Sequence, residues 1–235
     1  MILKSNGITD IESWFNIAPP MEGTRQWKDG RSAKELARYI TNSLPHMPKE
    51  IEATLLHFTK TNAELEWAAE YTTKLQPHGL GKGNGRCHDA FMFNSEIVVG
   101  IEGKADEPLG SKLIGEELKN ANDNKRLRIN GMIQMLFGDA PEKHESIRYQ
   151  LVTASAATLI EAAKRCVSKA MLMVITFKKE GCYKSERIAA NKADIQRFLT
   201  ELSARQENDY FVLPTPYGSK NGIELYFKHI EINVD

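Results

Sequence analysis

The sequence predicts an α/β protein in which helices flank a central mixed β-sheet. Helical periodicity dominates the first third of the chain, and two short apolar runs joined by a polar turn come next. Helical and extended segments then alternate up to the C-terminus, which is typical of a sheet covered by helical layers. Because no low-complexity linker separates these parts, we expect residues 1–235 to form a single domain. Within it we expect a helical part at 1–60, a core at 61–178, and a C-terminal helix and strand at 179–235.

The composition is that of a globular protein and excludes several functional classes. Hydrophobic residues make up 41% of the 235 residues and charged residues 26%, which excludes a disordered chain. The 31 Lys and Arg residues balance 31 Asp and Glu residues. This balance argues against a polybasic tail protein, although a local basic patch is enough to contact phosphates.

The chain shows no sign of secretion or of membrane insertion. Its three cysteines, Cys87, Cys166 and Cys182, lack the CxxC spacing of zinc sites, and their odd number does not suit a disulfide framework. No apolar run approaches the roughly 18 residues of a membrane helix. The first residues also lack the apolar segment of a signal peptide. We therefore expect a cytoplasmic protein with no membrane partner.

Helices are predicted for most of the N-terminal third. Residues 9–15 form a short helix that ends before two prolines. Ser32, with Glu35 three residues later, forms a capping box for a helix at 33–43. A further helix follows the next prolines and continues through 63–75, where apolar side chains recur near one face.

A hairpin is predicted after a glycine-rich loop. The apolar runs 88–93 and 96–104 are separated by Asn94-Ser95, and a two-residue polar turn between such runs is a hairpin signal. The rest of the chain predicts helices at 113–121, 126–137, 149–165 and 192–203, a strand at 170–177 and an extended segment at 222–234.

This hairpin brings three ionisable side chains to one face. With the two turn residues named above, Asp89 lies opposite Gly100. Strand alternation then places Asp89, Glu102 and Lys104 on the same face. Asp89 and Glu102 become diagonal neighbours about 7–8 Å apart at the backbone. Gly100 would leave space beside them.

Two carboxylates at that separation suit a hard cation. Mg²⁺ takes oxygen ligands, usually one or two carboxylates together with water and substrate phosphate. A bound ion polarises a phosphodiester and helps to generate hydroxide. Lys104 would orient the attacking water or stabilise the charge that develops on phosphorus. The alternative is a salt-bridged hairpin face that has no catalytic role.

The string His88-Asp89, followed by Glu102-Gly103-Lys104, resembles the motif of the PD-(D/E)XK nuclease superfamily. In that motif an acidic residue opens one strand and (D/E)-x-K ends the next. The strings GIEGKADEPLG and RYQLVTASAATLIEA are similar to a bacterial branch of the superfamily. The resemblance covers about residues 60–178.

The resemblance implies both a fold and an activity. The fold is a restriction-endonuclease-like three-layer sandwich, with a core of helix, three strands, helix and strand. The activity is metal-dependent hydrolysis of phosphodiester bonds in nucleic acid, with DNA as the expected polymer. Asp89 and Glu102 would be the ligands of Mg²⁺ or Mn²⁺, and Lys104 the catalytic lysine.

Further site residues also follow from the resemblance. Many members add a glutamate from the helix before the first strand, and Glu64 is preferred here over Glu66 and Glu70. Some add a glutamine from the following helix, and Gln150 is preferred over Gln134. Apart from the resemblance, four basic residues of the glycine-rich loop and of a later basic cluster are candidates for contacts with the phosphate backbone: Lys82, Arg86, Arg126 and Arg128.

Two alternatives stay open at this point. The chain could be an inactive module of the same fold that binds nucleic acid or a protein partner. The sequence also leaves DNA and RNA both open as substrates. A homodimer is compatible with cutting both strands of a duplex, although no residue pattern indicates one.

Overall fold

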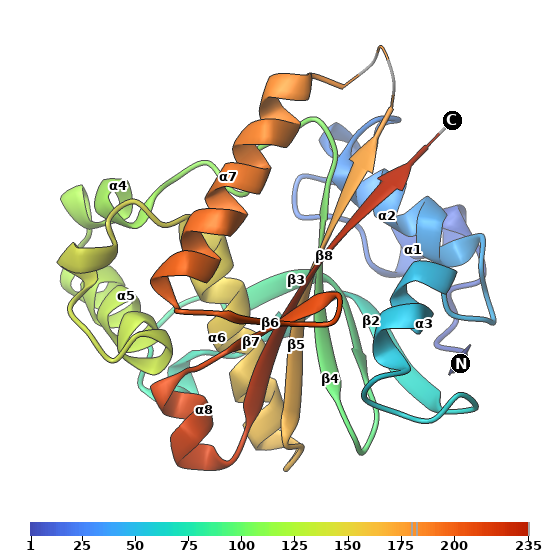
Figure 1. The fold of residues 1–235 in the computed structure, drawn as a ribbon. Helices are drawn as coiled ribbons and strands as arrows, with labels where there is room; N and C mark the ends of the chain where they lie inside the picture. Colours follow the sequence, from blue (N-terminus) through green and yellow to red (C-terminus); the bar gives the residue numbers. More distant parts are fainter. Residues whose placement is uncertain (180, 182, 235) are drawn as a thin grey trace.

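The computed structural model describes residues 1–179, 181 and 183–234 (Figure 1). Its strands form one eight-stranded sheet in the order β1-β2-β3-β4-β5-β8-β7-β6. The strands are β1 Ile2–Leu3, β2 Glu64–Thr73, β3 Arg86–Phe93, β4 Val98–Lys104, β5 Lys169–Lys178, β6 Arg205–Glu207, β7 Tyr210–Leu213 and β8 Glu224–Asn233. The predicted class, an α/β protein with a mixed sheet packed by helices, is confirmed.

The helices are α1 Ile11–Ile17, α2 Ser32–Thr41, α3 Lys49–Leu55, α4 Ile114–Lys119, α5 Asp123–Leu136, α6 Tyr149–Lys164, α7 Ser185–Glu201 and α8 Pro216–Asn221. Three short 3₁₀ turns are η1 Gly23–Arg25, η2 Gln76–His78 and η3 Pro141–His144. Among the described residues, none of these helices has the length and apolar character that crossing a membrane requires.

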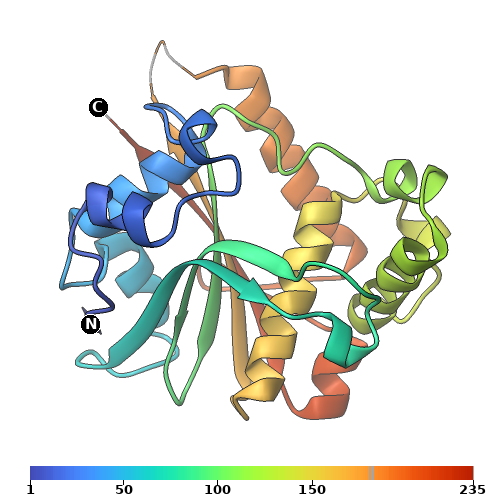
Figure 2. The same ribbon diagram turned by 180° about the vertical axis from the view of Figure 1, so that it is seen from behind.

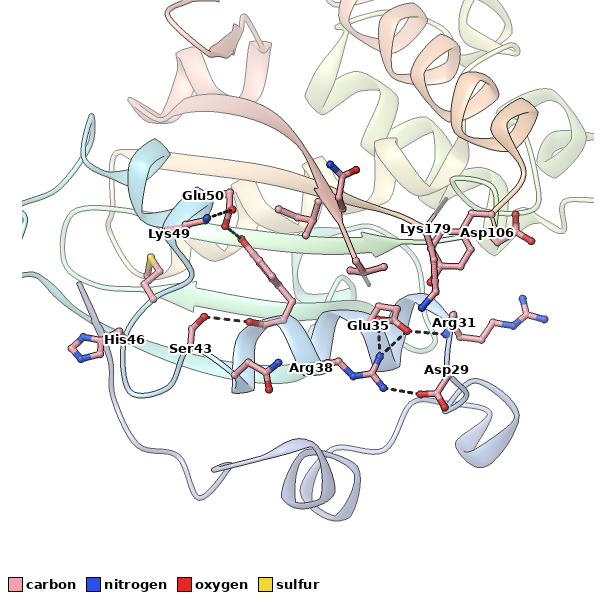
Figure 3. Close-up of a pocket in the computed structure, with 18 residues that line it drawn as sticks. Asp29, Arg31, Glu35, Arg38, Ser43, His46, Lys49, Glu50, Asp106 and Lys179 are labelled. Atoms are coloured by element: carbon pink, nitrogen blue, oxygen red, sulfur yellow. Dashed lines mark hydrogen bonds and ion pairs between the residues drawn. The ribbon is translucent and has the colours of Figure 1, made fainter. Parts of the chain in front are cut away.

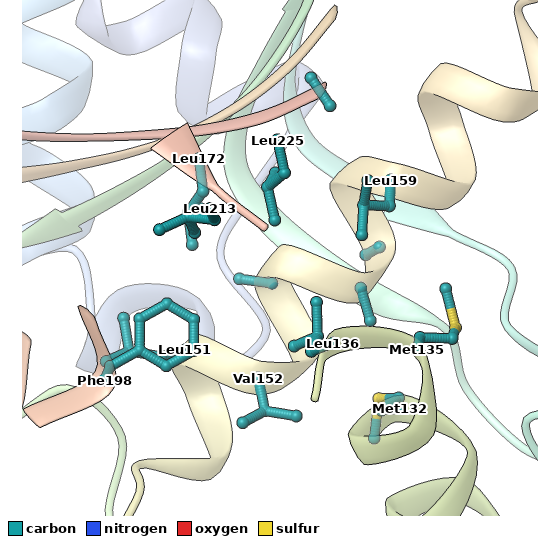
Figure 4. Packing of buried hydrophobic residues seen from close by; sticks show 14 of the residues in the cluster. Met132, Met135, Leu136, Leu151, Val152, Leu159, Leu172, Phe198, Leu213 and Leu225 are labelled. Carbon is teal, nitrogen blue, oxygen red and sulfur yellow. The ribbon is translucent and has the colours of Figure 1, made fainter. Parts of the chain in front are cut away.

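Helices cover both faces of the sheet (Figures 1 and 2). Helices α1, α2 and α3 pack on one face, and α4 to α8 pack on the other. Strand alternation divides the side chains of β5 between the two cores. Leu172 and Val174 face α6 and α7, whereas Met171 and Met173 face the N-terminal helices. Figure 4 shows part of the core beneath α5, α6 and α7.

Strand direction follows from the connections. Strands β2, β3 and β4 form an antiparallel meander, in which the glycine-rich segment with η2 joins β2 to β3 and a short turn joins β3 to β4. The chain then crosses the sheet through α4, α5 and α6 before it enters β5, which is parallel to β4. A parallel neighbour needs such a crossover, because both strands must start from the same edge. Strand β8 adds on the other side of β5, also in parallel.

The helix predicted for 63–75 is wrong, because this segment is strand β2. Leu65 and Trp67 are buried, whereas Glu64 and Glu66 are exposed, so the segment has the period of two that a strand requires. The apolar side chains that suggested one face of a helix also fit this shorter period. Pairing with β1 on one side and β3 on the other decides the outcome.

The capping box predicted from Ser32 and Glu35 is also wrong. The N-cap of α2 is Arg31, which makes no side-chain cap. Glu35 instead accepts a hydrogen bond from the backbone N–H of Gly30 at 2.8 Å. The Oγ of Ser32 accepts a hydrogen bond from the N–H of Ala105 at 3.0 Å. Ser32 therefore attaches the start of α2 to the segment that follows β4.

The hairpin is confirmed, but its register differs by two residues from the prediction. Phe93 pairs with Val98 and Phe91 pairs with Gly100. The turn therefore includes two more residues, and Asn94 Oδ1 stabilises it by accepting from the N–H groups of Glu96 and Ile97. A shift of two does not by itself change which face a residue occupies.

Gly100 consequently lies opposite Phe91, and the space beside it is filled rather than open. The α6 side of Gly100 is occupied by Thr158 and His88.

Replacing Gly100 with Ala should lower the free energy of unfolding by about 1–3 kcal/mol, the usual range for overpacking a core. The added Cβ would lie 2.6 Å from Thr158 Oγ1 and 2.7 Å from His88 Cε1, and both residues are fully buried. Urea denaturation followed by tryptophan fluorescence measures the loss. Gly103→Ala is the matched control, because its Cβ would meet Leu36 Cβ at 3.2 Å. Equal losses for the two variants would contradict this packing.

Candidate active site

A cleft of about 500 Å³ lies where β2, β3 and β4 meet the starts of α2 and α6. It is lined by Glu70, Asp89, Lys104, Arg86 and Gln150, together with residues of the segments before α2 and after β4. One predicted metal ligand, Asp89, therefore lines the same cleft as the predicted lysine and the predicted glutamine. Glu102 lies directly beneath it and is 1% exposed.

An irregularity in β2 shapes this cleft. Glu70 has a φ of 47°, which is in the left-handed region and uncommon for a residue other than glycine. Trp67 packs with the N-terminal helices, yet Tyr71 packs on the opposite core and stacks on Phe91. Regular alternation would place Trp67 and Tyr71 on one face. The change of face at Glu70 turns its carboxylate toward the cleft.

Strand β3 shows the matching irregularity. His88 and Phe91 are three residues apart but lie on the same side of the sheet, with ring centroids 5.6 Å apart. His88 is fully buried, and its Nδ1 lies 3.0 Å from Glu102 Oε1. His88, the residue before Asp89, thus contacts the predicted metal ligand Glu102 directly.

Glu102 is the most heavily engaged side chain of the site. Its Oε1 faces His88, and its Oε2 accepts from Gln150 Nε2 at 2.6 Å. Arg86 Nη2 lies 2.5 Å from the same Oε2. Strand β4, helix α6 and the start of β3 are therefore held together through one buried carboxylate.

The pKa of Glu102 reflects these partners. Burial alone raises the pKa of this carboxyl, but the Arg86 guanidinium and the hydrogen bond to His88 outweigh burial and bring the pKa to about 2. Burial lowers the pKa of the His88 ring. The ring is therefore neutral at pH 7, and its Nδ1–H donates to the Glu102 carboxylate.

The pKa values of Asp89 and Glu70 are raised, in contrast to that of Glu102. Burial, with the nearby Glu102 charge, raises the pKa of Asp89 to about 6, although Lys104 and the backbone N–H of Gly103 act against the rise. Burial and the Asp89 charge raise the pKa of Glu70 to about 8. The site thus holds more carboxyl groups than its own cations can neutralise.

Two other groups complete the site. Cys87 Sγ lies 3.4 Å from Glu70 Oε2, and burial raises the pKa of this thiol to about 12, so it stays protonated. Cys166 is also a free thiol, and Cys182 lies outside the described residues. Lys104 is 8% exposed, and the described part of the chain gives it no hydrogen bond or ion pair.

Some predicted site residues lie elsewhere. Glu64 is exposed on β2, outside the cleft, and among the described residues it pairs with Lys4 at 3.8 Å. Glu70, and not the preferred Glu64, is the glutamate of this segment that lines the cleft. The cause is the helix wrongly predicted for this segment. Of the two candidate glutamines, Gln134 donates to the carbonyl of Asp139 on the surface, whereas Gln150 is at the cleft.

The four predicted phosphate contacts also separate. Arg86 is inside the site. The Arg126 guanidinium donates to the backbone carbonyl of Leu118. The Arg128 guanidinium donates to the backbone carbonyls of Leu80 and Lys82. Lys82 is exposed on the glycine-rich loop. Arg126 and Arg128 therefore have structural partners, and only Arg128 lines a small cavity of about 280 Å³ that adjoins the cleft.

The cleft is also lined by two cationic residues that the sequence did not predict as site residues, Arg25 and Arg31. Arg25 is exposed, and Arg31 pairs with Glu107 at 3.3 Å. They belong to the string TRQWKDGR before α2, which is rich in cationic side chains. That richness is the only signal in the sequence, because nothing there places this segment next to β4.

A larger cavity of about 1300 Å³ lies between α2, α3 and the end of β8 (Figure 3). Its charged side chains neutralise one another. Arg38 pairs with Asp29 at 2.7 Å and with Glu35 at 2.8 Å, and Tyr39 donates to Glu50 at 2.8 Å. The smaller cleft, with its excess of acidic groups and its unpaired lysine, is the better candidate for catalysis.

The site contains the donors that a hard cation uses but not a finished coordination shell. Within the described ranges, no group of three or more His, Cys, Asp or Glu side chains is arranged to hold a metal ion. The raised pKa values of Asp89 and Glu70 show that an added positive charge would be favourable there. Asp89 and Glu102, the two predicted ligands, supply carboxylate oxygens of the kind that Mg²⁺ or Mn²⁺ takes, and Glu70 is a third carboxyl at the same cleft.

Replacing Glu70 with Gln should stabilise the protein above about pH 8 by about 1–2 kcal/mol, a discounted figure because Glu70 is partly exposed. Because the pKa of Glu70 is higher in the folded state, the free energy of unfolding falls as the pH rises from 4.5, the ordinary pKa of the group, through about 8. The variant should not show this loss. Urea denaturation between pH 5 and pH 9 measures it. Glu66→Gln, an exposed change on the same strand, should follow the unmodified protein, and equal pH profiles for all three would contradict the assignment.

Comparison with known proteins gives one relationship. No curated protein and no solved structure matches the chain. A family model matches residues 7–234, which is nearly the whole sequence. The chain therefore belongs to the family described as Domain of unknown function (DUF6946).

Proposed function

We propose that this protein is a metal-dependent nuclease of the PD-(D/E)XK type that hydrolyses phosphodiester bonds, with DNA as the expected substrate. The observation that carries the proposal is that Asp89 and Lys104 line one cleft, which cationic side chains also line, and that the buried Glu102 carboxylate lies directly beneath it. The element order supports a restriction-endonuclease-like fold. Helices precede the antiparallel meander β2-β3-β4, and α6 then leads into β5, parallel to β4.

The proposed reaction divides the work among the residues of the cleft. A bound Mg²⁺ or Mn²⁺ would polarise the phosphodiester and lower the pKa of a water molecule. Asp89 and Glu102 would hold that cation. Glu70, whose pKa is raised by burial and by the charges of these two carboxylates, would be a third ligand. The Lys104 ammonium would orient the water and stabilise charge on the phosphoryl oxygens. Water adds to phosphorus, one P–O bond breaks, and the leaving oxygen gains a proton.

The second candidate is a module that binds nucleic acid without cutting it. The observation that favours it is the full engagement of Glu102 by Arg86, Gln150 and His88, which leaves little room for a metal on that carboxylate. In this case the cationic side chains of the cleft would bind phosphates, and the carboxylates would only set its shape.

Metal-dependent cleavage should be lost when Asp89 is replaced with Asn. The experiment incubates labelled single-stranded and duplex DNA and RNA with Mn²⁺, Mg²⁺ or EDTA, and it follows the products on denaturing gels. Asp89→Asn removes a ligand charge while keeping the shape, so we expect cleavage to fall by at least about 100-fold. Glu64→Gln is the control, because Glu64 is an exposed acid outside the cleft. Binding without cleavage by the unmodified protein would favour the second candidate.

Lys104→Met should separate catalysis from folding. Lys104 is buried and has no ion-pair partner in the described structure, so replacing it removes a desolvated charge. The replacement also removes the attraction that favours the ionised forms of Asp89 and Glu102, and because the two effects oppose each other we expect little change in the free energy of unfolding. Cleavage should fall by about 100- to 10,000-fold, the range for a positioned proton-transfer or charge-stabilising group. Single-turnover cleavage and urea denaturation of the same preparation test both parts. Destabilisation by several kcal/mol would assign Lys104 a structural role instead.

A further inference from the structure

Arg86 occupies the position on Glu102 that a metal ion would need. Its Nη2 lies 2.5 Å from Glu102 Oε2, the oxygen that also accepts from Gln150. With His88 on Oε1, three donors surround a carboxylate that is 1% exposed. A cation at Oε2 and the Arg86 guanidinium carry the same sign of charge, so the two compete for one oxygen.

Arg86 also keeps unused binding capacity. Its Nε and Nη2 are both buried without a hydrogen-bond partner among the described residues, and the contact of Nη2 with Glu102 is an ion pair. An unsatisfied buried donor is unfavourable, and a guanidinium binds phosphate oxygens with paired N–H groups. The side chain is 20% exposed and lines the cleft, so an anion that enters can reach it.

The backbone of Arg86 is fixed, so any movement must be that of the side chain. Arg86 pairs with Thr73 across β2 and β3. A Cβ on the preceding Gly85 would lie only 2.0 Å from the carbonyl oxygen of Thr73. The two strands therefore approach closely at this point, and a change of side-chain rotamer is the motion that remains.

We propose that Arg86 is an internal counter-ion that blocks the metal site until a phosphodiester enters the cleft. The phosphate draws the guanidinium away from Glu102, and the freed Oε2 then accepts the metal ion. Phosphate binding frees Glu102 Oε2 for the metal ion, and metal binding at Oε2 frees the Arg86 guanidinium for the phosphate. Metal and nucleic acid consequently bind cooperatively. This inference rests on the proposed function, since it concerns the same site and the same metal.

Calorimetric titration with Mn²⁺ alone tests the inference. Arg86→Gln should bind Mn²⁺ at least about ten-fold more tightly than the unmodified protein, a change within the usual range of coupling between sites. Arg25→Gln removes the same charge from the same cleft without touching Glu102, so its Mn²⁺ affinity should stay within about two-fold. Equal tightening in the two variants, weaker binding by Arg86→Gln, or no Mn²⁺ binding by any form would each overturn the inference.

A second measurement covers the case in which Arg86→Gln does not fold. Fluorescence anisotropy of a labelled phosphorothioate oligonucleotide, with and without Mn²⁺, uses the unmodified protein. Mn²⁺ should tighten oligonucleotide binding by at least about ten-fold, and independent binding would overturn the inference. Cleavage distinguishes the two proposals. Tight Mn²⁺ binding by Arg86→Gln without cleavage by any form contradicts the nuclease, whereas cleavage without tightening contradicts the role of Arg86.

Discussion

The buried carboxylate of Glu102 is the interaction on which the site depends. It joins β4 to the start of β3 through Arg86 and His88, and to α6 through Gln150. A buried charge is stable only when its partners satisfy it. Because Glu102 lies on β4 and its partners lie on β3 and α6, the meander and the crossover helix must dock in one relative position before the charge is neutralised. The same docking forms the cleft.

The charge of the site is divided between two kinds of carboxyl group. Glu102 is ionised at any ordinary pH because Arg86 and His88 stabilise its charge. Asp89 and Glu70 carry raised pKa values because burial and neighbouring acids act on them together. The fold therefore maintains a local excess of acid that folding itself does not need. Such a concentration of perturbed groups in a cleft is typical of a functional site, and a bound cation is what would relieve it.

The sequence predicted much of this site because the relevant pattern is local. Asp89, Glu102 and Lys104 belong to one hairpin, and an error of two residues in register does not change their faces. Glu70 was not preferred, because the segment around it also fits a helical period and only pairing with β1 and β3 makes it a strand. The left-handed backbone at Glu70 and the position of Arg25 depend on tertiary contacts, which no spacing in the sequence records. The role of Arg86 was likewise visible only as a positive charge.

The proposed reaction requires that the cleft bind a metal ion together with a phosphodiester. A crystal structure grown with Mn²⁺ and a non-cleavable phosphorothioate oligonucleotide would show whether it does, because the anomalous signal locates the metal. We expect a peak coordinated by the carboxylates of Asp89 and Glu102, a phosphate oxygen in the same shell, and the Arg86 guanidinium turned toward that phosphate. An oligonucleotide bound in the cleft with no metal peak, and with Arg86 still on Glu102, would contradict it.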